Sequence, residues 1–396
     1  MLNALILIAV VAAGGLLLQP RLANSQLWRA TITPLASIIG SGFLVLGPIL
    51  DVSFGAMAPL AMAALCLTGW VFGSAIRFNI SRLHTIGSRA PAVMQLETVA
   101  SMLLAFAYII SVAYYLNLFG SFGVRLTALD DAYHARLLTT AVFALILVVG
   151  WTQGFAALER MEQVAVGLKL AIIAGLLVGL SVHFGEKLSE RALVFSGATV
   201  SGWSAITLGF GLIVTVQGFE TSRYLGQNYD AATRIRSMRL AQIIATIIYM
   251  IYIGLLAYVF EPGAMKLDET AIIDLMELVA PILPALLVAA ALSAQLSAAM
   301  ADTSGSGGLV AEVSGGRVSV RQAYAVLVAI GVGLTWTADV YQIISYASRA
   351  FALYYAAQAA IAALTAWDAG DSRRVLLFAP LAVLGCAIAL FGQAVE

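Results

Sequence analysis

Long apolar runs recur along the whole chain, separated by short polar segments. A helix needs about 20 apolar residues to cross a bilayer, and runs of roughly 17–25 residues indicate such spans. By this measure we predict twelve transmembrane helices and an all-α membrane protein. The chain is 61% hydrophobic and only 11% charged, with a mean hydropathy of +0.96, whereas soluble domains carry about 25% charged residues. The predicted spans are residues 2–18, 29–50, 57–78, 92–119, 137–151, 164–183, 203–227, 240–260, 281–300, 323–337, 340–367 and 375–391.

Lysine and arginine are distributed unevenly over the loops between these spans. With the N-terminus outside, 14 of the 21 basic residues fall in cytoplasmic loops and 5 in outer loops. Cytoplasmic loops of membrane proteins carry the excess of positive charge, so we expect both termini on the extracytoplasmic side of the cytoplasmic (inner) membrane. The other two basic residues, Lys169 and Arg349, fall inside predicted spans.

Two of the predicted spans are interrupted by glycines. Residues 37–43 (Ser-Ile-Ile-Gly-Ser-Gly-Phe) break the second span, and Gly209, Gly211 and Gly218 interrupt the seventh. Backbone groups freed by a helix break must be satisfied by protein or by a polar cavity, because hydrocarbon offers no partners. The alternative for the first break is close helix packing through small residues. Both breaks therefore mark candidate ligand sites.

Each interrupted helix opens a block of five predicted spans. Five is odd, so the two blocks have opposite orientations, as in transporters built from inverted repeats whose broken helices form a midplane binding site. We predict a five-plus-five inverted repeat with one extra helix at each end. The expected divisions are an accessory N-terminal helix (1–28), a first repeat (29–183), a second repeat (184–367) and an accessory C-terminal helix (368–396).

Three motifs in these helices resemble one family. Residues 38–43 (Ile-Ile-Gly-Ser-Gly-Phe) are similar to the first core helix of the amino acid/polyamine/organocation (APC) superfamily of transporters. Residues 216–220 (Val-Gln-Gly-Phe-Glu) resemble its sixth core helix, and Lys169 stands where many members have a Lys-Leu pair. The resemblance covers the chain after its first helix and implies an amino acid permease-like protein with the leucine-transporter-type fold.

The first break is predicted to bind the substrate carboxylate. Half-helix N-termini expose free backbone N–H groups, and the helix dipole there favours negative charge. The carbonyl groups at the end of each preceding half-helix would face the substrate ammonium, and the resemblance implies the same arrangement. Tyr114, Tyr115, Tyr354 and Tyr355 could also line the pocket. The predicted substrate-binding residues are Ile38, Ile39, Gly40, Ser41, Gly42, Thr215, Gln217, Gly218 and Tyr108.

Lys169 is predicted to take part in coupling. It lies ~14 Å from the cytoplasmic end of its span at 1.5 Å per residue, and an intramembrane lysine is a functional-site hypothesis unless it snorkels to the interface. The resemblance implies a built-in cation where sodium-coupled relatives bind their ion, hence coupling to a proton, or no cation at all, rather than sodium. Its expected partners are Ser293, Gln295 or Ser297.

Glu220 and Arg349 complete the predicted coupling and gating residues. Glu220 is either in a local ion pair with Arg223 at i+3 or a protonatable carboxylate that couples gating to pH. Arg349 cannot release its proton and needs a partner within the membrane. Its candidate partners are Glu220, Glu97 or a substrate carboxylate, with a structural or gating pair favoured.

These features predict a secondary active transporter of an amino acid or related small zwitterion, working by alternating access with proton coupling. Alternatives are a sodium-coupled carrier, an organic-cation or polyamine carrier, or, in another class, a transporter-like membrane sensor. Cys66 and Cys386 lie in apolar segments, and the histidines lie near segment ends or in loops. We therefore expect no enzyme activity, cofactor, metal or nucleic acid. The expected partners are the small-molecule substrate, a proton and the lipid bilayer.

Overall fold

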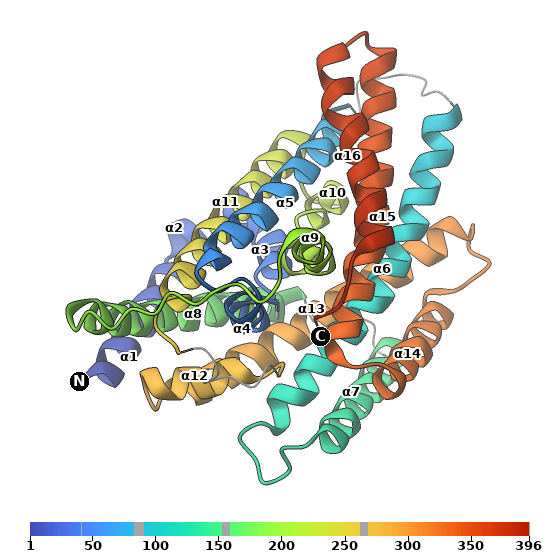
Figure 1. Cartoon of the computed structure of the whole chain (residues 1–396). Coiled ribbons are helices and arrows are strands. Elements are labelled where there is room, and N and C mark those ends of the chain that lie inside the picture. Colours follow the sequence, from blue (N-terminus) through green and yellow to red (C-terminus); the bar gives the residue numbers. More distant parts are fainter. Residues whose placement is uncertain (41, 83–90, 153–158, 262–267, 396) are drawn as a thin grey trace.

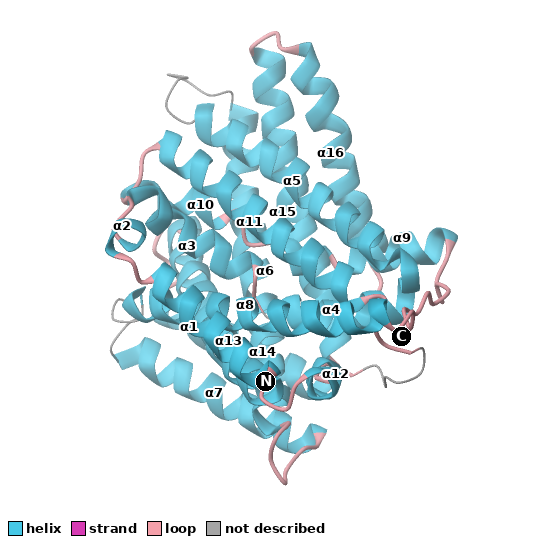
Figure 2. Ribbon diagram, turned by 90° about the vertical axis from the view of Figure 1, so that its left-hand side faces the viewer, coloured by secondary structure: helices cyan, strands magenta, loops and turns pink. Residues whose placement is uncertain are grey.

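The structure is a computed structural model, and it describes residues 1–40, 42–82, 91–152, 159–261 and 268–395, apart from the side chains of residues 159–164 and 227. Throughout these ranges the regular elements are helices (Figures 1 and 2). Three are short 3₁₀ helices, named η. The helices are α1 (Leu2–Leu17), α2 (Pro20–Ala23), α3 (Gln26–Ile38), α4 (Gly42–Phe54), η1 (Gly55–Met57), α5 (Ala58–Arg82), α6 (Pro91–Val124), α7 (Ala132–Thr152), α8 (Glu159–Ser189), α9 (Gly202–Gly211), η2 (Ile213–Val216), α10 (Thr221–Tyr224), η3 (Leu225–Gln227), α11 (Ala231–Leu256), α12 (Ala271–Val279), α13 (Leu283–Val313), α14 (Val320–Thr337), α15 (Val340–Asp368) and α16 (Ser372–Phe391).

In the described ranges, 9 helical stretches are long and apolar enough to cross a membrane. The first is Gly42–Arg82, which joins α4, η1 and α5, and the other eight contain α6 to α8, α11 and α13 to α16. The two short predicted spans are among them, because α7 has 21 residues and α14 has 18. The other three predicted spans correspond to α1, to α3 with α4, and to the segment from α9 to η3. The count of twelve and the inverted relation of the two blocks stay predictions.

Both predicted helix breaks are present, although Gly209 lies within α9 and does not interrupt it. Helix α3 ends at Ile38, and Ile39 leaves the helical conformation with φ −86° and ψ 59° before α4 begins at Gly42. In the second break, α9 ends at Gly211 and η2 follows. Gln217 is then extended, and Gly218 has φ +114°, which a glycine adopts without strain.

Helices α6 and α15 are the most deeply buried of the membrane-length helices in the described ranges. Helix α6 packs against α13, α15 and α7, while α15 packs along α16 and α5. The N-terminal helix α1 packs on α8, where Ile6 fits against Gly175 and Gly179. Small residues at such contacts let two helices approach closely. This packing brings the two helix breaks together between α6, α11 and α15.

Candidate functional site

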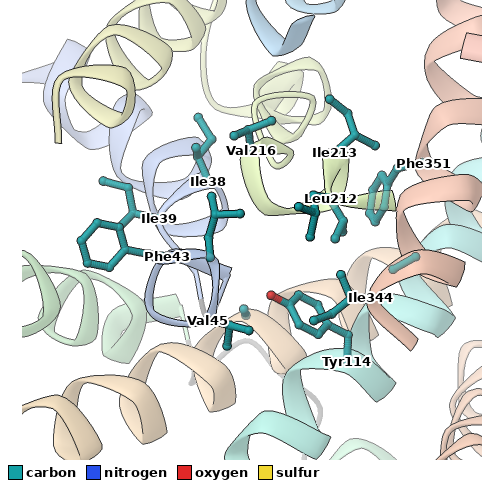
Figure 3. Close-up of a cluster of buried hydrophobic side chains, with 14 of the residues drawn as sticks. Ile38, Ile39, Phe43, Val45, Tyr114, Leu212, Ile213, Val216, Ile344 and Phe351 are labelled. Carbon is teal, nitrogen blue, oxygen red and sulfur yellow. The ribbon is translucent and has the colours of Figure 1, made fainter. Parts of the chain in front are cut away.

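The two helix breaks touch each other through glycines. A Cβ atom on Gly218 would lie 2.4 Å from Ser37 Cβ and 2.7 Å from the Ile38 nitrogen. A Cβ atom on Gly42 would lie 3.1 Å from Thr215 Cα. Figure 3 shows Ile38 of the first break beside Val216 of the second, whereas the side chains of Ile39 and Phe43 point away from the second break. Only glycine permits this approach of the two backbones.

A tyrosine hydroxyl joins the carbonyl groups of the two breaks. The Tyr249 Oη of α11 lies 3.0 Å from the Ile38 carbonyl oxygen and 2.6 Å from that of Thr215. A hydroxyl has one proton to donate, so the two carbonyl oxygens share a single donor. The carbonyls predicted to face a substrate ammonium thus converge on one point. Tyr249 is not among the predicted site residues, because its sequence shows only a polar aromatic residue within an apolar helix.

The predicted anion site lies at the start of α4, a helix of 13 residues. Its Ser41 lies outside the described residues. The neighbouring glycines lie beside tyrosines of α6, because a Cβ on Gly40 would be 3.8 Å from the Tyr115 ring and one on Gly42 would be 3.0 Å from the Tyr114 hydroxyl. The first backbone N–H groups of a helix have no partner within it, so this end of α4 can receive a carboxylate.

Two buried acceptor atoms at the second break lack a donor among the described residues. Gln217 donates from Nε2 to the Tyr115 hydroxyl at 3.0 Å, and its Oε1 has no hydrogen-bond partner. Glu220 Oε2 accepts from the Gly218 N–H and from the Tyr355 hydroxyl, both at 2.9 Å, and its Oε1 has no partner. A buried acceptor without a donor costs about 1–3 kcal/mol. Each of these atoms can accept a hydrogen bond from a donor that reaches it.

Lys169 lies buried against the first break. Its Nζ donates to the Ala36 carbonyl of α3 at 2.9 Å. Lys169 also lines a small cavity with Gly40, Phe43 and three alanines of α13, Ala290, Ala291 and Ala294. The facing part of α13 therefore presents alanines, and Ser293, Gln295 and Ser297 do not line this cavity. Gln295 is fully buried with neither amide atom bonded to a described residue.

The predicted ion pairs differ from the contacts found. Arg223 contacts Glu97 of α6 at 2.5 Å rather than Glu220. Arg349 donates from Nε to the Ala389 carbonyl of α16 at 2.7 Å, and among the described residues it pairs with neither Glu220 nor Glu97. The Glu220–Arg223 pair and the two protein partners expected for Arg349 are therefore wrong. Helix rotation, which local spacing does not determine, places Arg223 toward α6 and Arg349 toward α16.

Tyr108 lies one layer away from the helix breaks. Its ring is buried against Phe351 of α15, with the ring centres 6.0 Å apart. Phe351 in turn lies 6.2 Å from Tyr355, which donates to Glu220. Tyr108 is thus joined to the site through two aromatic rings, whereas Tyr115 and Tyr355 bond directly to Gln217 and Glu220. The substrate-binding and coupling roles of all these residues stay predictions.

Comparison with known proteins agrees with this architecture. A family model described as APC superfamily transporter matches residues 20–392. The chain is also similar to an uncharacterized protein of Aquifex aeolicus (strain VF5), with 41% identity over 388 residues that cover 96% of this chain and 94% of the relative. Together with the membrane-length helices, this makes the chain a multi-pass membrane protein. It belongs to the APC superfamily of transporters.

Proposed function

We propose that this protein carries an amino acid or a related small zwitterion across the cytoplasmic membrane by alternating access, coupled to a proton rather than to sodium. The observation that carries the proposal is the contact between the two helix breaks. It places the N-terminus of α4 close to the carbonyl groups of Ile38 and Thr215. A zwitterion offers a carboxylate for the helix N-terminus and an ammonium group for carbonyl oxygens.

Lys169 supports the coupling part of the proposal. Its ammonium group holds the Ala36 carbonyl one turn before the first break. Binding and release of a proton at Lys169 would strengthen and weaken this contact, because a charged donor makes a stronger hydrogen bond than a neutral amine, and the change would act on Ile38 and Ile39 next to it. A lysine serves this role where arginine does not, because arginine keeps its proton in proteins.

Uptake into proteoliposomes tests the proposal. Radiolabelled amino acids are offered under a proton gradient, a sodium gradient and no gradient. We expect accumulation of at least one amino acid under the proton gradient alone, and we expect Lys169→Met to abolish the dependence on that gradient. Accumulation that requires sodium would contradict the coupling, and transport of none of the amino acids would contradict the substrate class.

The unbonded acceptor atoms at the second break favour one other substrate class. Gln217 Oε1 and Glu220 Oε1 are both buried, and both would suit a cationic amine. An organic cation or polyamine is therefore the second candidate. Labelled putrescine and spermidine belong in the same uptake assay. Uptake of a polyamine that Glu220→Gln abolishes, without uptake of any amino acid, would favour this candidate.

A further inference from the structure

A second cavity lies beside α9 and reaches Ile213 at the start of η2. It has a volume of about 300 Å³ and opens as a groove between α5, α9 and α16, with the end of α4 at its base. We call it the α5–α9–α16 groove. Its lining includes Leu50, Ala64, Leu65, Gly209, Phe210 and Leu384.

The chemistry of the groove suits hydrocarbon and not water. Thr68 supplies the one polar side chain among the described lining residues, and its hydroxyl already donates to the Ala64 carbonyl at 2.8 Å. A buried water needs 2–4 polar partners, whereas apolar cavities of about 150 Å³ stay dry and bind benzene. This groove has twice that volume. It can hold an aliphatic chain of several carbons and offers water no donors.

The position of the groove determines what can reach it. Two of its walls, α5 and α16, belong to membrane-length spans, and the rim residue Ile206 is 48% exposed. The groove therefore opens toward the hydrocarbon that surrounds the protein. A Cβ atom on Gly209 would meet no atom within 4 Å, so α9 leaves real space beside its glycine. The molecules present at this depth are the acyl chains of lipids.

We propose that the α5–α9–α16 groove is a binding site for one acyl chain of a membrane phospholipid. A chain in this groove contacts Gly209 and Phe210, next to the point where α9 gives way to η2 and the second break. A bound chain thus packs directly against α9, the half-helix that precedes the second break. Binding of the chain stabilises the arrangement of α4, α5, α9 and α16 found here.

Photolabelling in nanodiscs tests the site without any transport measurement. The full chain is assembled with phosphatidylcholine that carries a diazirine within one acyl chain, and adducts are mapped by mass spectrometry. We expect adducts to concentrate on residues 61–68 and 205–213, above their frequency on the exposed face of α14. Adducts spread evenly over the lipid-facing helices would overturn the proposal, because they would report only the surrounding bilayer.

Two variants fill the groove from opposite walls. Gly209→Phe places a ring in the open space beside α9, and Ala64→Phe does the same from α5. Each should abolish the adducts on both walls, and both replace residues that lie within continuous helices, Gly209 in α9 and Ala64 in α5. The matched control is Gly333→Phe on α14, where a Cβ atom also meets nothing within 4 Å. Helix α14, all of which the structure describes, contributes no residue to the lining of the groove. It should leave the pattern unchanged.

The variants also separate lipid from other occupants. The two variants are compared only where they keep a sharp melting transition, which shows that they fold. If adducts on residues 61–68 and 205–213 persist in both, the label does not lie in the groove and the proposal fails. If the walls remain unlabelled in the wild type while copies of the chain cross-link through them, a second copy covers the groove and the proposal also fails. The wild-type map decides the question even where a filled variant does not fold.

Discussion

Gly218 is the residue on which the contact of the two breaks depends most directly. Glycine adopts its φ of +114° without strain, whereas residues with a side chain rarely do. A Cβ atom at this position would also clash with the backbone of Ser37 and Ile38. Strain in such a conformation costs about 1–3 kcal/mol for a residue with a side chain. A steric clash with backbone atoms adds to it, because no rotamer change can relieve that clash.

Gly218→Ala is therefore expected to lower the free energy of unfolding by roughly 2–4 kcal/mol and to abolish transport. Thermal unfolding of the purified protein and proteoliposome uptake measure the two effects. The control is Gly254→Ala in α11, where a Cβ meets nothing within 4 Å. That change should be neutral or stabilise by about 0.4–1 kcal/mol. Equal melting temperatures for the two variants would contradict the close contact of the breaks.

Lys169→Met separates the charge of this side chain from its packing. Methionine retains an unbranched apolar stem, and the variant loses the hydrogen bond to the Ala36 carbonyl. A hydrogen bond from a charged group contributes about 1.5–3 kcal/mol, so the rate of uptake should fall by roughly 10–100-fold. The chain should still fold, as judged by size-exclusion chromatography. If the Lys169→Met variant takes up substrate as fast as the wild type at two pH values, Lys169 has no role in coupling.

At the scale of elements, the sequence predicted the helix breaks and missed most of the contacts between helices. Glycine is unfavourable within a helix, so its position in the sequence is itself a local sign of a break. The interruptions near Gly40 and Gly218 were therefore predicted where the structure has them. The partners of Arg223 and Arg349 depend on how each helix is rotated and on residues far away in sequence, such as Glu97 and Ala389. A single sequence carries no direct signal for such pairs.

The Arg223–Glu97 pair ties the short helix α10 to α6. Their side chains are 7% and 21% exposed, and breaking a buried pair costs about 3–5 kcal/mol. Because Glu97 is partly exposed, we expect Arg223→Glu to lower the free energy of unfolding by less than breaking a fully buried pair would, roughly 1–3 kcal/mol. Glu97→Arg should cost a similar amount, and the double exchange should recover part of both. Additive losses in this double-mutant cycle, measured by thermal unfolding, would show that the pair contributes no coupling.

The segment that follows α16 packs against α9 and forms hydrogen bonds with it. The Gln393 N–H donates to the Thr207 carbonyl at 3.0 Å, and the Thr207 hydroxyl donates to Gln393 Oε1 at 2.9 Å. A Cβ on Gly211 would lie 1.7 Å from the Gln393 carbonyl oxygen. This segment and α9 therefore pack backbone against backbone.

Gly211→Ala should weaken the contact between this segment and α9, because the new methyl group displaces Gln393 and breaks its hydrogen bonds to Thr207. We expect a loss of about 1–3 kcal/mol in thermal unfolding. Gly209→Ala in the same helix is the matched control, since its Cβ would enter open space. It should leave the protein as stable as the wild type or slightly more so. A reversed order of the two melting temperatures would contradict the packing of α9.

At the scale of the whole molecule, the described chain combines nine membrane-length helical stretches with two broken helices whose breaks meet near the centre. Unbroken helices satisfy their own backbone groups in hydrocarbon. The breaks interrupt that pattern, and the Tyr249 hydroxyl contacts the carbonyl oxygens of Ile38 and Thr215 there. Composition and hydropathy predicted this class of protein, and the family motifs predicted its superfamily. The substrate depends on side chains that neither kind of signal identifies.

Ligand-dependent thermal stabilisation tests the central claim, that a zwitterion binds where the two breaks meet. The purified protein is melted with amino acids, polyamines or no ligand, with and without sodium. A ligand at 100 times its Kd stabilises by about 2.7 kcal/mol. We predict a clear rise in melting temperature with at least one amino acid in sodium-free buffer, reduced in Tyr249→Phe. Stabilisation by sodium alone, by polyamines alone, or by an amino acid equally in Tyr249→Phe would contradict the account.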